Sequence, residues 1–132
     1  MLLVDTNVLV DMLQDDPQWA GWSISQLCAQ ASIHQLTINP IIYVEISLSF
    51  STLDALDSAV STLGLEVREI PRPALFLAAR ACVQYCRRGD SKLQVLPDFF
   101  IGAHAAVEGW PLLTRDATRF RTYFPTVEVV TP

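Results

Sequence analysis

The sequence predicts an α/β protein in which one parallel sheet of about five strands is flanked by helices. Short apolar runs closed by turn or cap residues alternate with stretches whose apolar residues recur at helical spacing. Strands separated by helices favour a parallel sheet with helices on both faces. The 132 residues are 51% apolar and 17% charged, which fits a buried sheet and excludes a disordered chain.

Each expected strand is a short run rich in apolar residues and bounded by turn residues. The five runs are residues 2–4, 36–38, 65–70, 110–113 and 127–130. Residues 2–4 are apolar throughout, as in a buried strand. Residues 65–70 alternate apolar and charged side chains, as in a strand near a sheet edge.

Most of the expected helices begin at a cap residue or a proline, both of which favour the first helical turn. These starts are Asp5-Thr6, Asp16-Pro17, Asn39-Pro40, Pro71 to Pro73 and Pro97. Apolar stripes predict two further helices, over residues 53–63 before Gly64 and over residues 117–123. In the helix after Pro73, the side chains expected to face inward are Leu75, Phe76, Ala79, Cys82, Val83 and Cys86.

Two features of the sequence point to a cytoplasmic protein. Cys28, Cys82 and Cys86 lie in helical stretches without a second Cys or His pair at ligand spacing, so we expect reduced core thiols. We also expect no membrane span and no secretory signal, because the apolar runs are interrupted and no basic residue precedes the first one.

Charge is distributed unevenly along the chain, whose formal net charge is −5. Residues 1–67 contain eight acidic residues and no Lys or Arg, whereas residues 68–132 contain all nine basic residues and six acidic ones. This asymmetry fits contact with a polyanion or a charged partner, and it also fits solvated helix faces. Composition alone favours the solvated faces.

Four acidic residues, Asp5, Glu45, Asp98 and Asp116, stand in apolar surroundings. Two of them directly follow expected strands and two lie near helix starts, so parallel connections of the usual hand bring all four to one sheet edge. Packed carboxylates repel one another unless a cation lies among them, and oxygen ligands favour Mg²⁺ or Mn²⁺. Such an ion can activate water to attack a phosphodiester. Taken alone, either Asp98 or Asp116 is equally well explained as a helix cap.

Four segments resemble the acidic motifs of the PIN-domain family, in particular those of VapC-type toxins from toxin–antitoxin pairs. The segments are Leu2-Leu3-Val4-Asp5-Thr6-Asn7, Tyr43-Val44-Glu45, Pro97-Asp98-Phe99-Phe100-Ile101-Gly102-Ala103-His104-Ala105 and Leu112-Leu113-Thr114-Arg115-Asp116. The resemblance spans almost the whole chain, in the same order and spacing. It implies one nuclease domain over residues 1–132 with a central parallel five-stranded sheet.

The resemblance also implies an activity and partners. The activity is a Mg²⁺- or Mn²⁺-dependent endoribonuclease, and the partners are a second copy of the chain and a cognate antitoxin whose carboxyl-terminal segment wraps the active-site groove. Carried over by position, the catalytic and metal-binding residues are Asp5, Glu45, Asp98 and Asp116. Thr6, Asn7 and Thr114 resemble polar residues that orient the carboxylates or the waters on the metal.

Two arginines, Arg115 and Arg119, lie on either side of Asp116. One hypothesis is that one of them binds an RNA phosphate, since a guanidinium can bind phosphate through two hydrogen bonds. An ion pair between Asp116 and Arg119 is an equally good interpretation. The basic loop from Arg87 to Lys92 is a second candidate for the RNA path, with an ordinary solvated loop as the simpler interpretation.

Two alternatives to a toxin remain open at this point. One is a PIN-like module that binds RNA or a protein partner without cleaving RNA, and the other is a PIN nuclease of RNA processing. The absence of one of the four acidic residues would favour the non-cleaving module, but all four are present.

Overall fold

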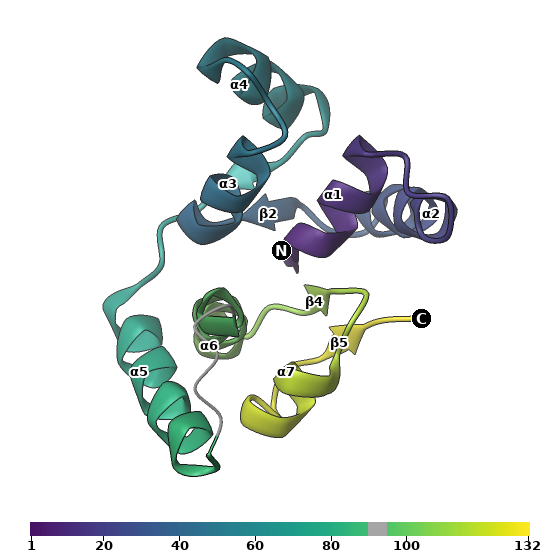
Figure 1. Ribbon diagram of the computed structural model, residues 1–132. Helices are drawn as coiled ribbons and strands as arrows, with labels where there is room; N and C mark the ends of the chain where they lie inside the picture. Colours follow the sequence, from purple (N-terminus) through teal and green to yellow (C-terminus); the bar gives the residue numbers. More distant parts are fainter. Residues whose placement is uncertain (90–94) are drawn as a thin grey trace.

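Five short strands form one parallel sheet at the centre of the molecule (Figure 1), as the sequence predicts. The computed structural model describes residues 1–89 and 95–132. The sheet order is β3-β2-β1-β4-β5, and every pairing is parallel. The strands are β1 (Leu2–Val4), β2 (Leu36–Ile38), β3 (Glu66–Val67), β4 (Leu112–Leu113) and β5 (Val129–Val130). Three strands are shorter than predicted, and in β4 Pro111 has no N–H to extend the ladder.

Helices flank this sheet, and polar side chains cap three of their starts. The helices are α1 (Thr6–Leu13), α2 (Ala20–Ala31), α3 (Pro40–Ser47), α4 (Leu53–Thr62), α5 (Arg72–Arg87), α6 (Leu96–Glu108) and α7 (Thr118–Tyr123). Asp5 caps α1, Asn39 caps α3 and Thr52 caps α4, each accepting a backbone N–H. The second helix begins at Ala20, later than predicted, because Asp16 accepts the N–H groups of Gln18 and Trp19 in a preceding turn.

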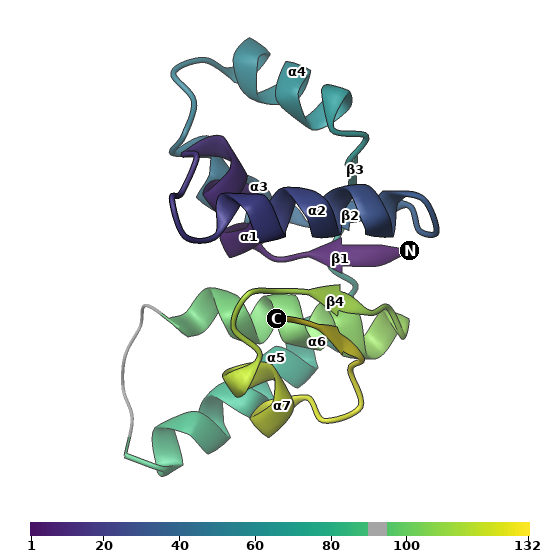
Figure 2. The same cartoon turned by 90° about the vertical axis from the view of Figure 1, so that its right-hand side faces the viewer.

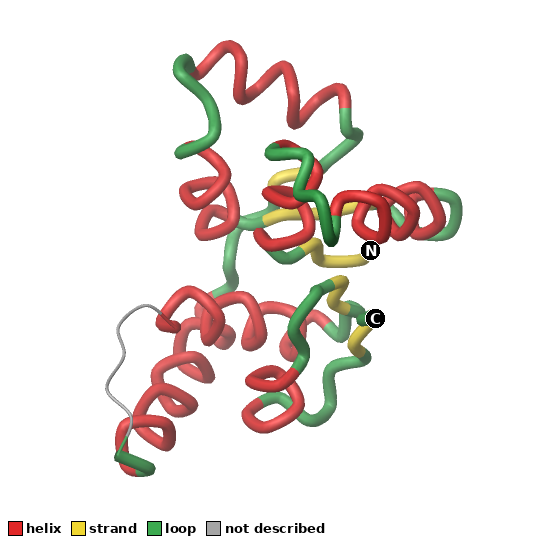
Figure 3. The backbone as a smooth tube through the Cα atoms, turned by 45° about the vertical axis from the view of Figure 1, so that its right-hand side comes forward, coloured by secondary structure: helices red, strands yellow, loops and turns green. Residues whose placement is uncertain are grey.

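The two halves of the sequence form the two halves of the molecule. The acid-rich residues 1–67 build β1 to β3 and α1 to α4, which lie above the β1–β4 boundary in Figures 1 and 2. The described residues of 68–132 build β4, β5 and α5 to α7 on the other side. Figure 3 shows the strands as a narrow band between the helices of both halves. Negative and positive parts of the chain therefore meet at the pairing of β1 with β4.

The inward face of α5 differs from the prediction. Its buried residues are Ala74, Ala78, Ala81 and Tyr85, whereas Phe76 is 63% exposed and Leu75 and Val83 are also exposed. The small alanines allow α5 to lie close against α6, so the larger apolar side chains face solvent. Cys28 and Cys86 are exposed and Cys82 is half-buried, which contradicts the expected core thiols.

Close packing also marks the middle of α6. A Cβ atom on Gly102 would collide with the ring of Phe124 and contact the ring of Phe120. Only glycine fits here, and this lets α6 approach the α7 segment closely. No helix in residues 1–89 or 95–132 is long and apolar enough to cross a membrane.

Candidate functional site

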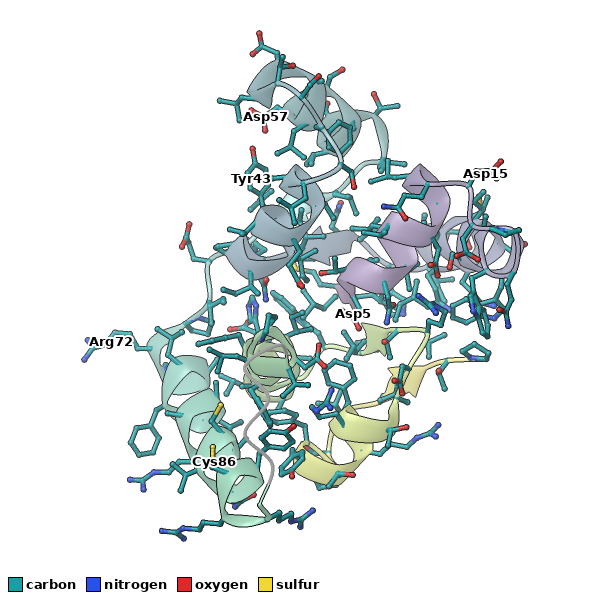
Figure 4. The ribbon with its side chains drawn as sticks, viewed as in Figure 1. Asp5, Asp15, Tyr43, Asp57, Arg72 and Cys86 are labelled. Atoms are coloured by element: carbon teal, nitrogen blue, oxygen red, sulfur yellow. The ribbon has the colours of Figure 1, made fainter. Side chains whose placement is uncertain are left out.

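Asp5 lies at the carboxyl end of β1, and its side chain is only 4% exposed. Its Oδ1 accepts the backbone N–H of Thr6 at 2.7 Å, and its Oδ2 accepts the hydroxyl of Thr114, also at 2.7 Å. Figure 4 labels Asp5 at the boundary between the two halves of the molecule. Because both oxygens are held, the orientation of this carboxylate is fixed.

Thr114 joins the ends of two neighbouring strands. It follows β4, which pairs with β1, and it is fully buried. The amide of Asn7 donates to the Thr114 hydroxyl oxygen at 3.2 Å, while the Asn7 Oδ1 accepts the backbone N–H of Arg115 at 3.1 Å. Asn7 and Thr114, both predicted as supporting residues, therefore tie α1 to the loop that carries Asp116.

Glu45 reaches the site from α3. Its Oε1 accepts the hydroxyl of Thr6 at 2.7 Å, so Thr6 links Glu45 to the backbone beside Asp5. Glu45 is half-buried and lies near the buried Ile42 and Ile46 in sequence. Leu48, three residues further along the chain, is 90% exposed.

Asp98 and Asp116 come from the other half of the chain. Asp98 lies in the first turn of α6, and its Oδ2 accepts a hydrogen bond from Nη1 of Arg119 at 2.7 Å. Asp116 is exposed, and its Oδ1 accepts the backbone N–H of Thr118 at 3.1 Å. The hypothetical ion pair between Asp116 and Arg119 is wrong, because the Arg119 guanidinium reaches across to α6.

The charges of neighbouring acids contribute to the pKa values of Asp5 and Asp98. Burial raises the pKa of Asp5 to about 7, hydrogen bonds from Thr114 and Thr6 lower it, and the charges of Asp98 and Glu45 raise it. Burial also raises the pKa of Asp98, which the Arg119 pair lowers and the charge of Asp116 raises. These couplings connect all four acids into one electrostatic cluster.

The cluster suits a hard cation in its chemistry. Its donors are carboxylate oxygens, which are the ligands that Mg²⁺ and Mn²⁺ prefer, and burial makes the charged forms of Asp5 and Asp98 costly without a nearby cation. Within the residues that the structure describes, no three His, Cys, Asp or Glu side chains lie close enough to hold a metal together. The acids would therefore have to move closer to bind one ion jointly.

Arg115 forms an ion pair with Asp11, a residue outside the four candidate acids. Its Nε lies 2.9 Å from Oδ2 of the buried Asp11, although not at hydrogen-bond geometry. Ser23 also donates to this Asp11 oxygen, and the guanidinium lies 5.4 Å from the ring centroid of Trp19. This geometry favours a structural role for Arg115 over a phosphate contact.

His104 is a buried side chain outside the acid cluster. Its Nδ1 lies 3.2 Å from the amide nitrogen of Asn39, whose Oδ1 caps α3. Because that amide can only donate, Nδ1 accepts and the ring is neutral. Burial correspondingly lowers the pKa of His104. These contacts give His104 a structural role.

A family model described as "PIN domain" matches residues 2–124. The chain belongs to the PIN-domain family. Among solved structures, the PIN chain is similar to one in VapBC2 from Rickettsia felis bound to a DNA fragment from their promoter. That match has a TM-score of 0.74 and 17% identity, and it covers 99% of this chain and 98% of that one.

Two further structures have the same fold. A chain of a toxin–antitoxin complex from Klebsiella pneumoniae matches with a TM-score of 0.67 and 23% identity, over 100% of this PIN chain and 98% of that one. A chain of VapBC-1 from nontypeable Haemophilus influenzae matches with a TM-score of 0.74 and 14% identity. That match covers 98% of this PIN chain and 96% of the other chain. Because the sequence identities are this low, the matches show that the folds are similar and nothing more. No curated protein matches the chain.

Proposed function

We propose that this PIN domain is a divalent-metal-dependent endoribonuclease and acts as the toxin of a toxin–antitoxin pair. The observation that carries the nuclease proposal is the coupled cluster of Asp5, Glu45, Asp98 and Asp116 at one edge of the sheet. The charges of Asp98 and Glu45 raise the pKa of Asp5, and the charge of Asp116 raises that of Asp98, so a cation among these carboxylates would relieve their repulsion. Mg²⁺ or Mn²⁺ is the cofactor that this donor set fits.

The chain's own residues divide into ligands and supports. Asp5, Glu45, Asp98 and Asp116 would hold the ion, and Thr114 and Thr6 orient the carboxylates of Asp5 and Glu45 through 2.7 Å hydrogen bonds. When bound, the ion supplies an activated water and neutralises charge on the phosphate oxygens. Asn7 keeps the loop after β4 in register with α1, so Asp116 stays near the other acids.

The toxin role is supported by the fold and by the division of charge. The similar chains come from complexes named VapBC or toxin–antitoxin. The acidic first half suits a basic segment of an inhibitory partner, and we propose a cognate antitoxin with such a segment and a homodimer of the toxin. Cytoplasmic RNA is the proposed substrate.

Cleavage of labelled RNA by the purified protein tests the nuclease proposal. We expect cleavage with Mg²⁺, none in excess EDTA, and a loss of at least about 100-fold in Asp5→Asn. Asp15→Asn is the matched control, because Asp15 is exposed in the turn after α1 and stands far from Asp5 in Figure 4. Undiminished activity in EDTA would contradict the metal requirement, and full activity of Asp5→Asn would contradict the site.

Growth on induction tests the toxin role separately. We expect expression of the protein to arrest bacterial growth and Asp5→Asn to leave it unaffected. An active ribonuclease that does not slow growth would point to RNA processing instead.

A further inference from the structure

A polar pocket of about 390 Å³ lies between the end of α5 and α7, beside the acid cluster. Residues that line it include Tyr85, Arg88, Asp116, Thr118, Arg119 and Tyr123. Because Asp116 is one of the four acids, the pocket adjoins the proposed cleavage site. Of its lining residues, only Asp116 has a role in the proposed cleavage.

Two guanidinium groups lie in the pocket wall, each set against an aromatic ring. The Cζ atom of Arg88 is 5.2 Å from the ring centroid of Tyr123, and that of Arg119 is 5.7 Å from the ring centroid of Tyr85. Contact with a ring face restricts a guanidinium to a few orientations and leaves its N–H groups free to bind an anion. The pocket therefore presents two oriented arginines beside the single acid Asp116, on a chain with net charge −5.

The two arginines differ in what they already bind. Arg119 binds the carboxylate of Asp98 at 2.7 Å, which shows that its guanidinium points toward the acid cluster. Arg88 is exposed and makes no ion pair with any residue in 1–89 or 95–132. The pocket thus has one arginine paired with Asp98 and a second, exposed arginine without an ion pair to the described residues.

We propose that this pocket binds the sugar-phosphate backbone of single-stranded RNA next to the phosphate that is cut, with Arg88 and Arg119 as its phosphate contacts. The inference rests on the proposed nuclease function and adds the path of the substrate. Single-stranded RNA fits because its flexible backbone can enter a pocket between two helices, whereas a duplex is rigid. Phosphate contacts of this kind bind without reading sequence.

RNA binding by charge-reversal variants tests the proposal. Asp5→Asn serves as the parent so that the RNA stays intact, and the probe is a short fluorescent single-stranded RNA of randomised sequence with Mg²⁺ present. Arg88→Glu is compared with Arg72→Glu by fluorescence anisotropy over a range of salt concentrations. Arg72 begins α5, and Figure 4 shows it at the opposite end of this helix from Cys86, which precedes Arg88 by two residues in the sequence.

The two variants change net charge equally, so they separate a specific contact from general repulsion. We expect Arg88→Glu to weaken binding about tenfold or more and to lower the salt slope by about 0.7, and Arg72→Glu to change affinity less than about twofold. Thermal denaturation of each variant checks that the fold is kept. Arg88→Gln, which removes the charge without reversing it, should weaken binding less than Arg88→Glu does.

The outcomes distinguish this inference from the nuclease proposal. Equal effects of Arg88→Glu and Arg72→Glu, or no effect of either, would overturn the pocket assignment while leaving cleavage by the wild-type protein intact. If the parent binds no RNA and the wild-type protein cuts none, the nuclease proposal itself fails. Loss of binding in Arg88→Glu alone supports the pocket.

Discussion

The hydroxyl of Thr114 donates to Oδ2 of Asp5 over 2.7 Å, although the two residues are 109 positions apart in the chain. This bond lowers the pKa of a carboxyl group that burial raises. It therefore keeps Asp5 closer to its charged, cation-binding form at neutral pH.

Removing this hydroxyl should impair the site without removing an acid. We expect Thr114→Val to reduce RNA cleavage by about 10- to 100-fold and to raise the pKa of Asp5 above about 7. Thr114→Ser keeps the hydroxyl and should retain most activity. The carboxyl resonance of Asp5, followed by NMR through a pH titration, measures the shift. An unchanged titration in Thr114→Val would show that the bond does not control Asp5.

Stability without metal should depend on the charge of Asp5. Its pKa is raised from 3.8 to about 7, so the folded protein binds a proton that the unfolded chain releases in this range. Stability is therefore lost as pH rises through the window from 3.8 to about 7, and the loss persists above it.

Asp5→Asn removes this charge and should stabilise the metal-free protein. We expect a gain of about 1–3 kcal/mol near pH 8 that shrinks toward pH 4, measured by thermal denaturation in EDTA. Added Mg²⁺ should stabilise the wild-type protein and leave Asp5→Asn unaffected. If the difference in stability between the wild-type protein and Asp5→Asn stays constant with pH, the expected titration of Asp5 is contradicted.

The ion pair between Asp11 and Arg115 should stabilise the fold and position the loop that carries Asp116. Asp11 is buried and Arg115 is partly exposed, so removing either partner leaves the other poorly compensated. We expect Asp11→Ala and Arg115→Ala each to cost about 1–3 kcal/mol, with a coupling energy of about 1 kcal/mol or more in a double-mutant cycle.

Denaturant unfolding measures these costs, and Arg121→Ala is the matched control. Arg121 is an exposed arginine on α7, and its truncation should change stability by less than about 0.5 kcal/mol. Additive costs in the cycle would mean that Asp11 and Arg115 do not interact in solution.

Two glycines in helices should respond oppositely to alanine. A methyl group on Gly102 would collide with Phe124, so Gly102→Ala should destabilise the protein by about 1–3 kcal/mol. A methyl group on Gly21 in α2 meets no atom within 4 Å, so Gly21→Ala should stabilise by up to about 1 kcal/mol. Thermal denaturation measures both, and a neutral Gly102→Ala would show that α6 and the Phe124 segment can separate.

Local sequence patterns predict much of the fold and of the candidate site. Asp5 and Asn39 cap helices as expected, because a cap depends only on residues a few positions away. The predicted inward face of α5 is wrong, because the size of the side chains, as well as their hydrophobicity, decides which face of a helix packs closely. The alanines at 74, 78 and 81 fit against α6, and Phe76 does not.

Partners distant in sequence were not predictable from patterns. Asp11 and Arg115 lie in opposite halves of the chain, and nothing near either residue indicates the other. Arg119 has Asp116 nearby in sequence, yet the structure pairs it with Asp98 on α6. The Arg88 pocket likewise depends on how α5 and α7 meet.

The position of β1 beside β4 has a consequence for the order in which the protein is made. During synthesis, β1 can pair with β2 and α1 to α4 can form early, but Thr114 and Asp116 leave the ribosome only after most of the chain. Until then Asp5 lacks its hydrogen-bond partner and Asp98 lacks Arg119. The sheet topology therefore leaves Asp5 and Asp98 without these partners until nearly the whole chain has been made.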